Sequence, residues 1–189
     1  MPPHLPNRLL PRQLLNAFIS AEDKTFYEHG GLDWQGIANA VVREIQIKIR
    51  GKGQKVGAST ITQQVARGFF LSNEKTYIRK IKEIFLALKI EKTLNKEEIL
   101  TLYLNRSFLG NRAYGVGAAA QVYYGKNLHE LTLPEIAMIA GLPQAPSAAN
   151  PIRNPARAMA RRNWVLSRML EKNNITQAQY QEAIDTPIS

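Results

Sequence analysis

The sequence contains no cysteine, only three histidines and no long run of apolar residues. The absence of cysteine excludes a disulfide scaffold and thiol catalysis, and so few histidines argue against a structural zinc site. No stretch of about 18 apolar residues is present, so no transmembrane helix is expected. The N-terminal MPPHLPNRLLPRQ also lacks the apolar segment of a signal peptide.

What the chain does contain is enough apolar material for one folded domain. It has 189 residues, of which 44% are hydrophobic, so a real core is expected. The formal net charge is +10. A basic surface of this size favours an anionic partner: nucleic acid, an anionic membrane surface or a phosphorylated substrate. No zinc-finger spacing or RNA-binding aromatic motif supports the first of these.

Helix start signals recur along the whole chain and predict an all-α fold. Helices are expected over 11–27, from Asp33, from Ser59 or Thr60, after Ser72-Asn73, over 95–105, over 118–123, over 132–141, from Asn154 and from Thr176. The apolar stripe of the third is expected to be Ile61, Val65 and Phe69, and that of the fourth Tyr77, Ile81, Ile84 and Leu88. Residues 46–57, which include GKGQKVG, are interpreted as a mobile loop or irregular edge.

Three groups of polar residues follow helical spacing. In the first, Glu22 continues a stripe begun by Leu15 and Phe18, with Asp23 beside it and Phe26 and His29 further along. The others are Thr60, Gln64 and Arg67, and Arg79, Lys80 and Glu83. Each group alone is explained as well by a solvated face or by a surface ion pair of about 0.3–0.5 kcal/mol.

Taken together, the three groups suggest glycosyl chemistry. Two separated carboxylates, Glu22 and Glu83, suit acid and base work at a sugar. Arginine and lysine suit a phosphate or pyrophosphate, and the helix that begins at GAST offers backbone N–H groups to an anion. Transfer from a sugar pyrophosphate needs both sets, although periodicity does not show that the groups meet in space.

Six ordered motifs at these positions resemble a known family. They are EDKTFYEHGGLD (22–33), GASTITQQVAR (57–67), RKIKE (79–83), KEEILTLYLN (96–105), RAYGVGAAAQVYYGK (112–126) and EIAMIAGLPQAPSAANP (135–151). The chain resembles, over roughly residues 14–185, the peptidoglycan glycosyltransferase domain (glycosyltransferase family 51) of class A penicillin-binding proteins, in their 1A-like branch.

The resemblance implies a lysozyme-like all-α fold with a large head lobe and a small membrane-apposed jaw lobe. Residues 1–189 are expected to form one glycosyltransferase domain, a fragment without the transmembrane anchor and without the transpeptidase domain of the full-length protein. The implied reaction polymerises lipid II into β-1,4-linked glycan with inversion and releases undecaprenyl pyrophosphate. The implied partners are lipid II, the growing lipid-linked glycan and the membrane surface, with no nucleic acid. The implied location is the periplasmic face of the bacterial inner membrane.

The same resemblance assigns roles to single residues. Glu22 matches the base that deprotonates the acceptor 4-hydroxyl, and we expect partial burial to raise its pKa. Glu83 matches the second essential glutamate, a candidate ligand for a divalent cation, Mg or Mn, although no cofactor is required for certain. The substrate-binding positions are Asp23, Phe26, His29, Ser59, Thr60, Gln63, Gln64, Arg67, Arg79 and Lys80.

Two positions depart from the family pattern, and one segment is unusual. Arg67 stands where many members have lysine, and Gly68 stands where asparagine is common. The segment 46–57 is long and basic. Its Lys48, Arg50, Lys52 and Lys55 either face anionic lipid or belong to a solvated loop, and we weigh the two equally.

Two other functions remain open at this point. A glycan-cleaving enzyme of the lysozyme or lytic transglycosylase kind shares the fold and a catalytic glutamate, but it needs no cations for a pyrophosphate. A basic helical nucleic-acid-binding module fits the net charge but not the ordered motifs.

Overall fold

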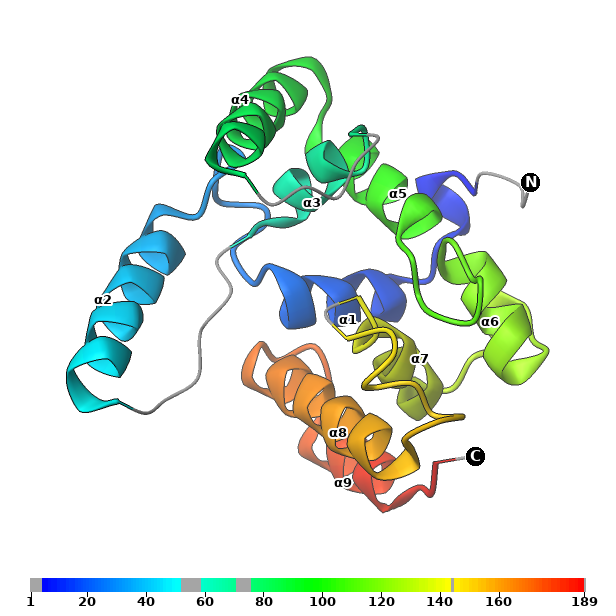
Figure 1. Cartoon of the computed structure of the whole chain (residues 1–189). Helices are drawn as coiled ribbons and strands as arrows, with labels where there is room; N and C mark the ends of the chain where they lie inside the picture. Colours follow the sequence, from blue (N-terminus) through cyan, green and yellow to red (C-terminus); the bar gives the residue numbers. More distant parts are fainter. Residues whose placement is uncertain (1–4, 52–58, 71–75, 144, 189) are drawn as a thin grey trace. The chain divides into compact units, whose positions relative to one another are not determined.

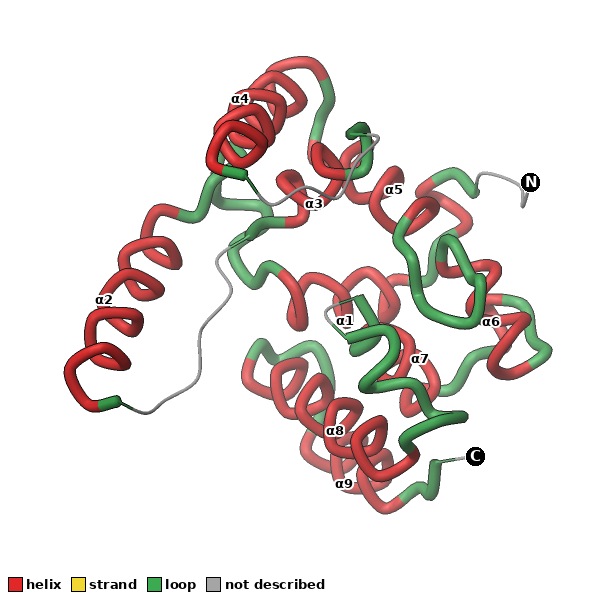
Figure 2. The backbone as a smooth tube through the Cα atoms, in the orientation of Figure 1, coloured by secondary structure: helices red, strands yellow, loops and turns green. Residues whose placement is uncertain are grey.

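The computed structural model describes residues 5–51, 59–70, 76–143 and 145–188, and within them the chain is helical (Figure 1). The α-helices are α1 (Arg12–Glu22), α2 (Trp34–Arg50), α3 (Ile61–Arg67), α4 (Tyr77–Thr93), α5 (Lys96–Arg106), α6 (Val116–Tyr124), α7 (Leu133–Ala140), α8 (Pro155–Glu171) and α9 (Gln177–Asp185). Two short 3-10 helices, η1 (Asn7–Leu9) and η2 (Leu128–Glu130), complete the elements. Figure 2 shows no strand in the described ranges, which confirms the predicted all-α class.

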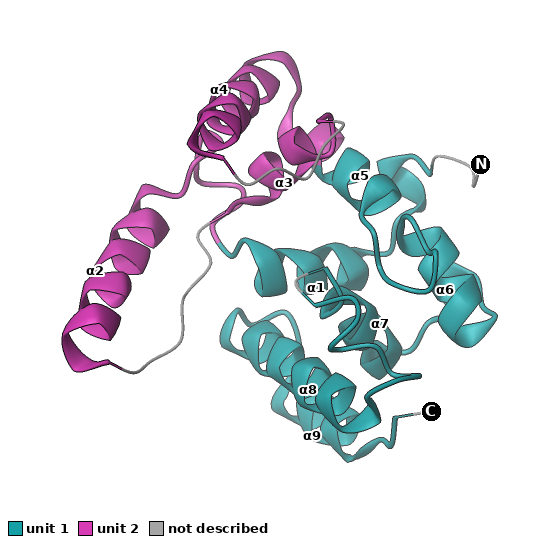
Figure 3. Ribbon diagram, viewed as in Figure 1, with its two compact units in different colours: residues 1–24, 100–189 teal, residues 25–99 magenta. Residues whose placement is uncertain are grey.

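The chain divides into two compact units (Figure 3). Unit 1 contains residues 1–24 and 100–189, and unit 2 contains residues 25–99. The boundary falls just after the end of α1 and again within α5.

The core of unit 1 is built by α1, α7 and α8, which pack on one another, with α9 added against α8 (Figure 1). Helix α7 is buried along most of its length, because LPEIAMIA is apolar on every side after its first turn. Helix α1 is amphipathic and buries Leu14, Leu15 and Phe18. Glu22, its last residue, lies on the same buried side.

The helix starts lie close to the predicted positions because they are set by local hydrogen bonds. Capping boxes open α3 at Thr60, α7 at Thr132 and α9 at Thr176, and Asp33 caps α2 through the N–H of Gly36. In each box the first residue and the third helical residue satisfy each other's backbone N–H. Such a signal is readable from four residues of sequence.

The segment before η1 is held to unit 1 by the side chain of Asn105. Its Oδ1 accepts the N–H of Leu5 at 2.8 Å, and its Nδ2 donates to the carbonyl of Leu5, also at 2.8 Å. Gly115 approaches the carbonyl of Asn105 so closely, at φ 88°, that a Cβ would overlap it. A glycine is therefore required there.

The first predicted helix was too long. Helix α1 ends at Glu22, and Asp23 leaves the helix at φ −162° and ψ 76°. Residues 24–28 form a turn. Phe26 and His29 therefore do not continue the stripe of Glu22, and both belong to unit 2.

The second correction concerns residues 46–57. Residues 46–50 are the last turns of α2, which ends at Gly51 in the left-handed conformation, φ 70°. The alternation of Ile45, Ile47 and Ile49 resembled a strand edge, but these residues are helical. Helix α2 buries none of its side chains, so no buried face sets its hydrophobic pattern. Residues 52–58, with Lys52 and Lys55, lie outside the described residues.

The third correction concerns the face of α4 that is buried in unit 2. The predicted stripe is largely outside the core: Tyr77 is 92% exposed and Ile81 is 53% exposed. The buried side chains are Glu83, Ala87 and Ile90. Helix α3 buries Ile61 and Val65 as predicted, but it ends at Arg67, so Phe69 lies beyond it and is half exposed.

Candidate active site

Glu22 and Asp23 occupy the C-terminal end of α1 in unit 1, and both are buried. The whole residue Glu22 is 9% exposed, but its side chain is 0% exposed, so the remaining exposure belongs to the backbone. The helix ends here because the N–H of Asp23 completes the last bond, to Ile19, while its own dihedral angles are no longer helical. The two carboxyl groups thus stand where α1 gives way to a turn.

Arg161 and Tyr103 of unit 1 contribute to the electrostatics around Glu22. Arg161 of α8 places Nη2 3.7 Å from Oε1 of Glu22, an ion-pair distance. Tyr103 of α5 is 3% exposed and packs edge-on against Phe18. Burial raises the pKa of the Tyr103 hydroxyl well above its ordinary value, and the charge of Glu22 raises it further. Tyr103 is therefore neutral at physiological pH.

Unit 2 contains a second carboxylate with its own cations. Glu83 has a side chain that is 4% exposed, and Nε of Arg67 lies 2.7 Å from its Oε1. Nζ of Lys80 lies 2.8 Å from its Oε2. Arg67 and Lys80 also reach the hydroxyl of Ser59, at 3.2 Å and 3.4 Å. The cations are about half exposed, at 54% and 48% of their side chains. Glu83 thus lies buried beneath a surface that carries the cations Arg67 and Lys80.

Arg79 adds a third cation from the first turn of α4. Its guanidinium lies 4.4 Å from the ring centroid of Phe70. A guanidinium stacked on an aromatic face keeps its N–H groups at the edge, where an anion can accept them. Arg67 and Lys80 bring two positive charges to the one carboxylate of Glu83, and Arg79 adds a further cation to the first turn of the same helix as Lys80. Such a group of cations suits a phosphate-bearing ligand.

Thr60 and Gln63 are held by structural hydrogen bonds. Oγ1 of Thr60 accepts the N–H of Gln63 at 3.1 Å and donates to the carbonyl of Gly31 at 2.8 Å. Oε1 of Gln63 accepts the N–H of Thr60 at 2.9 Å. Both residues are buried, at 1% and 3% exposed. Their predicted contact with substrate stays a prediction, whereas Gln64, one position on, is half-buried.

His29 and Phe26 lie in a network that the sequence analysis did not foresee. Nδ1 of His29 accepts the N–H of Gly31 at 3.0 Å. Lys96 donates to the carbonyl of His29 at 2.7 Å, forms an ion pair with Glu91 at 2.8 Å and lies over the Phe26 ring at 4.6 Å. These contacts fix the turn after α1. Lys96 and Glu91 had no predicted role, because the contact that joins them to the turn is not visible from helical spacing.

The residues around Glu83 do not fit a divalent metal. Mg²⁺ and Mn²⁺ prefer oxygen donors, and both oxygens of Glu83 lie in ion pairs with cations. Within the part of the chain that the structure describes, no group of three or more His, Asp or Glu residues could hold a metal ion. No step of the reaction is therefore assigned to a metal, and Mg or Mn at Glu83 stays a prediction.

The predicted residues fall into both units. Glu22 and Asp23 belong to unit 1, and the other ten predicted positions belong to unit 2. The structure brings Ser59, Arg67, Lys80 and Glu83 together, which helical spacing alone did not show. Sequence reasoning did not identify Arg161 as a neighbour of Glu22. The signal available was the helical spacing of Arg161, Trp164 and Arg168 on α8, where both arginines lie over the Trp164 ring.

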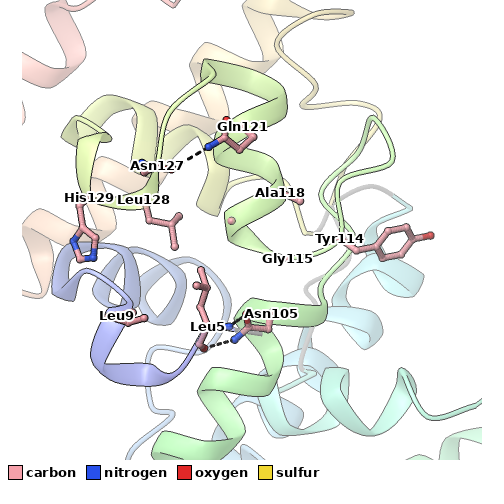
Figure 4. Close-up of a pocket in the computed structure, with 11 residues that line it drawn as sticks. Leu5, Leu9, Asn105, Tyr114, Gly115, Ala118, Gln121, Asn127, Leu128 and His129 are labelled. Atoms are coloured by element: carbon pink, nitrogen blue, oxygen red, sulfur yellow. Dashed lines mark hydrogen bonds between the residues drawn. The ribbon is translucent and has the colours of Figure 1, made fainter. Parts of the chain in front are cut away.

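A separate pocket of about 480 Å³ lies in unit 1 (Figure 4). Its walls include Leu5, Leu9 and Leu128, and its rim includes Gln121, which donates to Asn127 at 3.1 Å. No predicted site residue lines this pocket, and it contains no carboxylate. Its walls are largely apolar, and the residues that line it include the titratable side chain of His129.

Comparison with known proteins identifies the family. The model of the family described as Transglycosylase matches residues 4–170. The chain therefore belongs to the transglycosylase family.

Its relatives include penicillin-binding protein 1A of Haemophilus influenzae, 55% identical over 95% of this chain and 20% of the relative. That of Escherichia coli is 56% identical over 92% of this chain and 20% of the relative. The crystal structure of the Haemophilus influenzae protein covers 99% of this chain and 18% of its own chain, with a TM-score of 0.59 and 32% identity in that superposition. The chain thus spans about a fifth of the length of these relatives, and the predicted lysozyme-like class and 1A-like branch are confirmed.

Proposed function

We propose that this chain polymerises lipid II into β-1,4-linked glycan, with inversion at the anomeric carbon, at the periplasmic face of the bacterial inner membrane. The observation that carries the proposal is the cationic surface built on Glu83. A hydrolase that cleaves finished glycan has no pyrophosphate to hold, whereas a transferase with a lipid pyrophosphate leaving group needs such cations.

The proposed step moves one proton and exchanges one bond. The 4-hydroxyl oxygen of the acceptor N-acetylglucosamine forms a bond to the anomeric carbon of the donor, the growing lipid-linked chain. Its proton passes to the carboxylate of Glu22, and the bond from the anomeric carbon to pyrophosphate breaks with its electron pair on the leaving group. Asp23, Phe26 and His29 support the site around the base.

The cations of unit 2 suit the leaving group. Negative charge grows on undecaprenyl pyrophosphate as the bond breaks, and donors already in place stabilise that charge without reorganisation. Glu83 fixes Nε of Arg67 and Nζ of Lys80 through short ion pairs. Ser59, Thr60, Gln63, Gln64 and Arg79 complete the proposed donor site.

The membrane is the proposed surface partner, and a transpeptidase domain is the proposed neighbour in the full-length protein. No helix among the described residues is both long and apolar enough to span a bilayer. Helix α2 nevertheless exposes Trp34 (71%), Ile45 (51%) and Ile49 (79%), with Lys48 and Arg50 nearby. Such a mixture suits an interfacial helix.

The test is polymerisation of lipid II in detergent by the parent chain and by Glu22→Gln. Loss of a general base is expected to reduce the rate by about 10²–10⁴-fold. Glu182→Gln makes the same charge change at an exposed position of α9 and should keep the parent rate. Circular dichroism verifies that all three proteins are folded.

Three outcomes contradict the proposal. Full activity of Glu22→Gln rejects the base, and release of fragments from finished peptidoglycan without polymer formation favours a hydrolase. Salt-sensitive DNA binding by a folded chain that makes no polymer favours the nucleic-acid module.

A further inference from the structure

Arg161 is the cation that α8 presents to Glu22 in unit 1, and its side chain is fixed on several sides. Its Nε donates to the carbonyl of Gly141 at 3.2 Å, and its guanidinium lies 4.1 Å from the ring centroid of Trp164. Three quarters of the side chain are covered, since 25% is exposed. Arg161 is therefore part of the wall around Glu22 rather than a solvated surface arginine.

The end of α7 is shaped to receive Arg161. A Cβ added to Gly141 would come within 2.7 Å of Cγ of Arg161, so only glycine leaves room for this side chain without a shift. On the far side of Trp164 lies Arg168, 5.2 Å from the ring centroid, which also donates to the carbonyl of Ser20 in α1 at 3.4 Å. Helices α7 and α8 thus position the guanidinium of Arg161, and the contact of Arg168 with Ser20 joins α8 to α1.

The charges that face Glu22 within unit 1 leave Arg161 as its close positive neighbour. Asp23 is a second acid, and Tyr103 of α5 is neutral because burial and Glu22 raise its pKa. Arg168 of α8 lies behind Trp164 and repels Arg161. Helix α7 carries a single ionisable residue, Glu135, which is bound to Lys126 at 2.9 Å.

A buried carboxylate needs such a charge to act as a base. Burial disfavours the ionised form, and a protonated carboxyl group has no capacity to take the proton of an acceptor hydroxyl. Arginine keeps its charge over the whole working pH range, which lysine or histidine in a buried place need not do. Burial lowers the pKa of Arg161 from its ordinary value, and the attraction of Glu22 opposes that change.

We propose that Arg161 is a positioning residue that holds Glu22 as a carboxylate, ready to accept the proton of the sugar hydroxyl. The inference rests on the proposed function, since Glu22 is the base only if the chain is a transferase. It assigns to α8 a part in the reaction through charge and not through contact with substrate.

The test is the pH dependence of kcat/KM for lipid II polymerisation by the parent chain, Arg161→Gln and Arg161→Lys. Removal of a neighbouring cation typically moves a carboxyl group by about 1–3 pH units, so the acid limb of Arg161→Gln should move to higher pH by about that amount. The activity of Arg161→Gln should approach that of the parent at high pH. Arg161→Lys keeps the positive charge, so its acid limb should lie close to that of the parent. Arg157→Gln, an exposed arginine one turn earlier on α8, should leave the profile in place.

A second readout needs no substrate. The carbon-13 NMR resonance of the Glu22 carboxyl carbon is assigned by its absence from the spectrum of Glu22→Gln. In Arg161→Gln this resonance should titrate at higher pH than in the parent. An acid limb and a titration that stay in place, with activity reduced equally at every pH, overturn the inference and make Arg161 a structural residue. If the Glu22 titration shifts but neither the parent nor the variants polymerise lipid II, the ion pair is supported and the proposed function is rejected instead. If Arg161→Gln does not fold, Arg161→Met, which also removes the charge but keeps a long side chain, carries the same NMR comparison.

Discussion

Lys80 and Lys82 are two positions apart on α4 but differ in surroundings, which makes them a matched pair. Lys80 is bound to the buried carboxylate of Glu83 at 2.8 Å, whereas Lys82 is exposed. We expect Lys80→Gln to weaken inhibition of the polymerase by inorganic pyrophosphate about tenfold, the effect of losing one charge-assisted hydrogen bond of roughly 1.5 kcal/mol. Lys82→Gln should change it less than twofold. Equal effects in both variants would show that net charge, and not the Glu83 cluster, attracts the anion.

The same residues give a direct test of the metal. Because Arg67 and Lys80 already neutralise Glu83, we expect pyrophosphate inhibition of the chelator-treated chain to stay within about twofold of that in added Mg²⁺. The measurement compares inhibition curves in EDTA and in MgCl₂ for the parent and for Glu83→Gln. Inhibition that requires Mg²⁺ in the parent and not in Glu83→Gln would restore Glu83 as a metal ligand.

At the level of single side chains, sequence reasoning located some partners and missed others. Lys80 and Glu83 share one face of one helix, so their contact follows from spacing. The contact of Arg67 with Glu83 joins two helices, and spacing shows only that both carry suitable groups. Arg161 lies 139 positions from Glu22 in the chain, so only the packing of α1 and α8 reveals the pair.

Helix α7 shows how a single element depends on its first turn. Oε1 of Glu135 accepts the N–H of Thr132 at 2.8 Å, and Lys126 lies 2.9 Å from the same oxygen. Burial alone would raise the pKa of Glu135, but the hydrogen bonds of Thr132 and Lys126 outweigh it and hold the pKa below its ordinary value. The ionised form of Glu135 is therefore more stable in the folded chain than in the unfolded one.

A pH-dependent stability follows, with its sign fixed by that lowered pKa. The contribution is complete above the unfolded value near 4.5 and is lost as pH falls through the lower folded value. Glu135→Gln keeps an acceptor for Thr132 but removes the charge, so it should unfold about 0.5–1 kcal/mol more easily at pH 7. Urea titrations from pH 7 to pH 3 should show that difference shrinking towards zero.

The control for Glu135 is Glu182→Gln on α9, whose side chain is exposed. It should have little effect on stability at any of these pH values. A Glu135→Gln difference that grows on acidification would contradict the sign derived above.

Helix starts were predictable from sequence, whereas buried faces and helix ends were less so. Thr132 and Glu135 signal their box within four residues, because both partners are local. The end of α1 came five residues earlier than predicted, since the apolar side chain of Phe26 extends the periodic pattern into a turn. On α4 the periodicity of Tyr77 and Ile81 was real, yet this stripe is exposed and Glu83 is buried. Hydrophobic patterns identify a distinct face but not what covers it.

For the whole molecule, the net charge of +10 and the exposed face of α2 predict binding to anionic lipid. We expect vesicles containing phosphatidylglycerol to bind the chain at 0.15 M salt and to lose most of it at 1 M, where the Debye length falls from about 8 Å to about 3 Å. Replacing Lys48 and Arg50 by Gln should weaken binding roughly thirtyfold, at about 1 kcal/mol per charge.

Co-sedimentation with vesicles of neutral phosphatidylcholine separates the contribution of charge from that of the exposed apolar side chains of α2. The charge-matched control replaces Arg153 and Arg157, both exposed on unit 1, by Gln. A similar loss in both double variants would mean that total charge matters and that α2 has no special place. Unchanged binding in the Lys48 and Arg50 variant would show that these two side chains of α2 are solvated and do not face lipid.

At this scale the family was predictable because six motifs in order carry far more information than periodicity does. EDKTFYEHGG and GASTITQQ each combine a local turn or cap with polar residues, so their structural and chemical demands constrain many positions at once. The packing that buries Glu22 beside Arg161 was not predictable from the sequence, since it depends on the contacts of α1, α7 and α8 with one another.

The amide clamp between Asn105 and Leu5 has an evolutionary consequence. Asn105 binds the N–H and the carbonyl of Leu5, both of which belong to the backbone and not to the leucine side chain (Figure 4). Selection can therefore preserve the path of the chain into α1 while the residue at position 5 drifts among those that can supply an N–H. Among descendants of this domain, Asn105 should be retained and position 5 should vary, and proline should be the one residue absent from it.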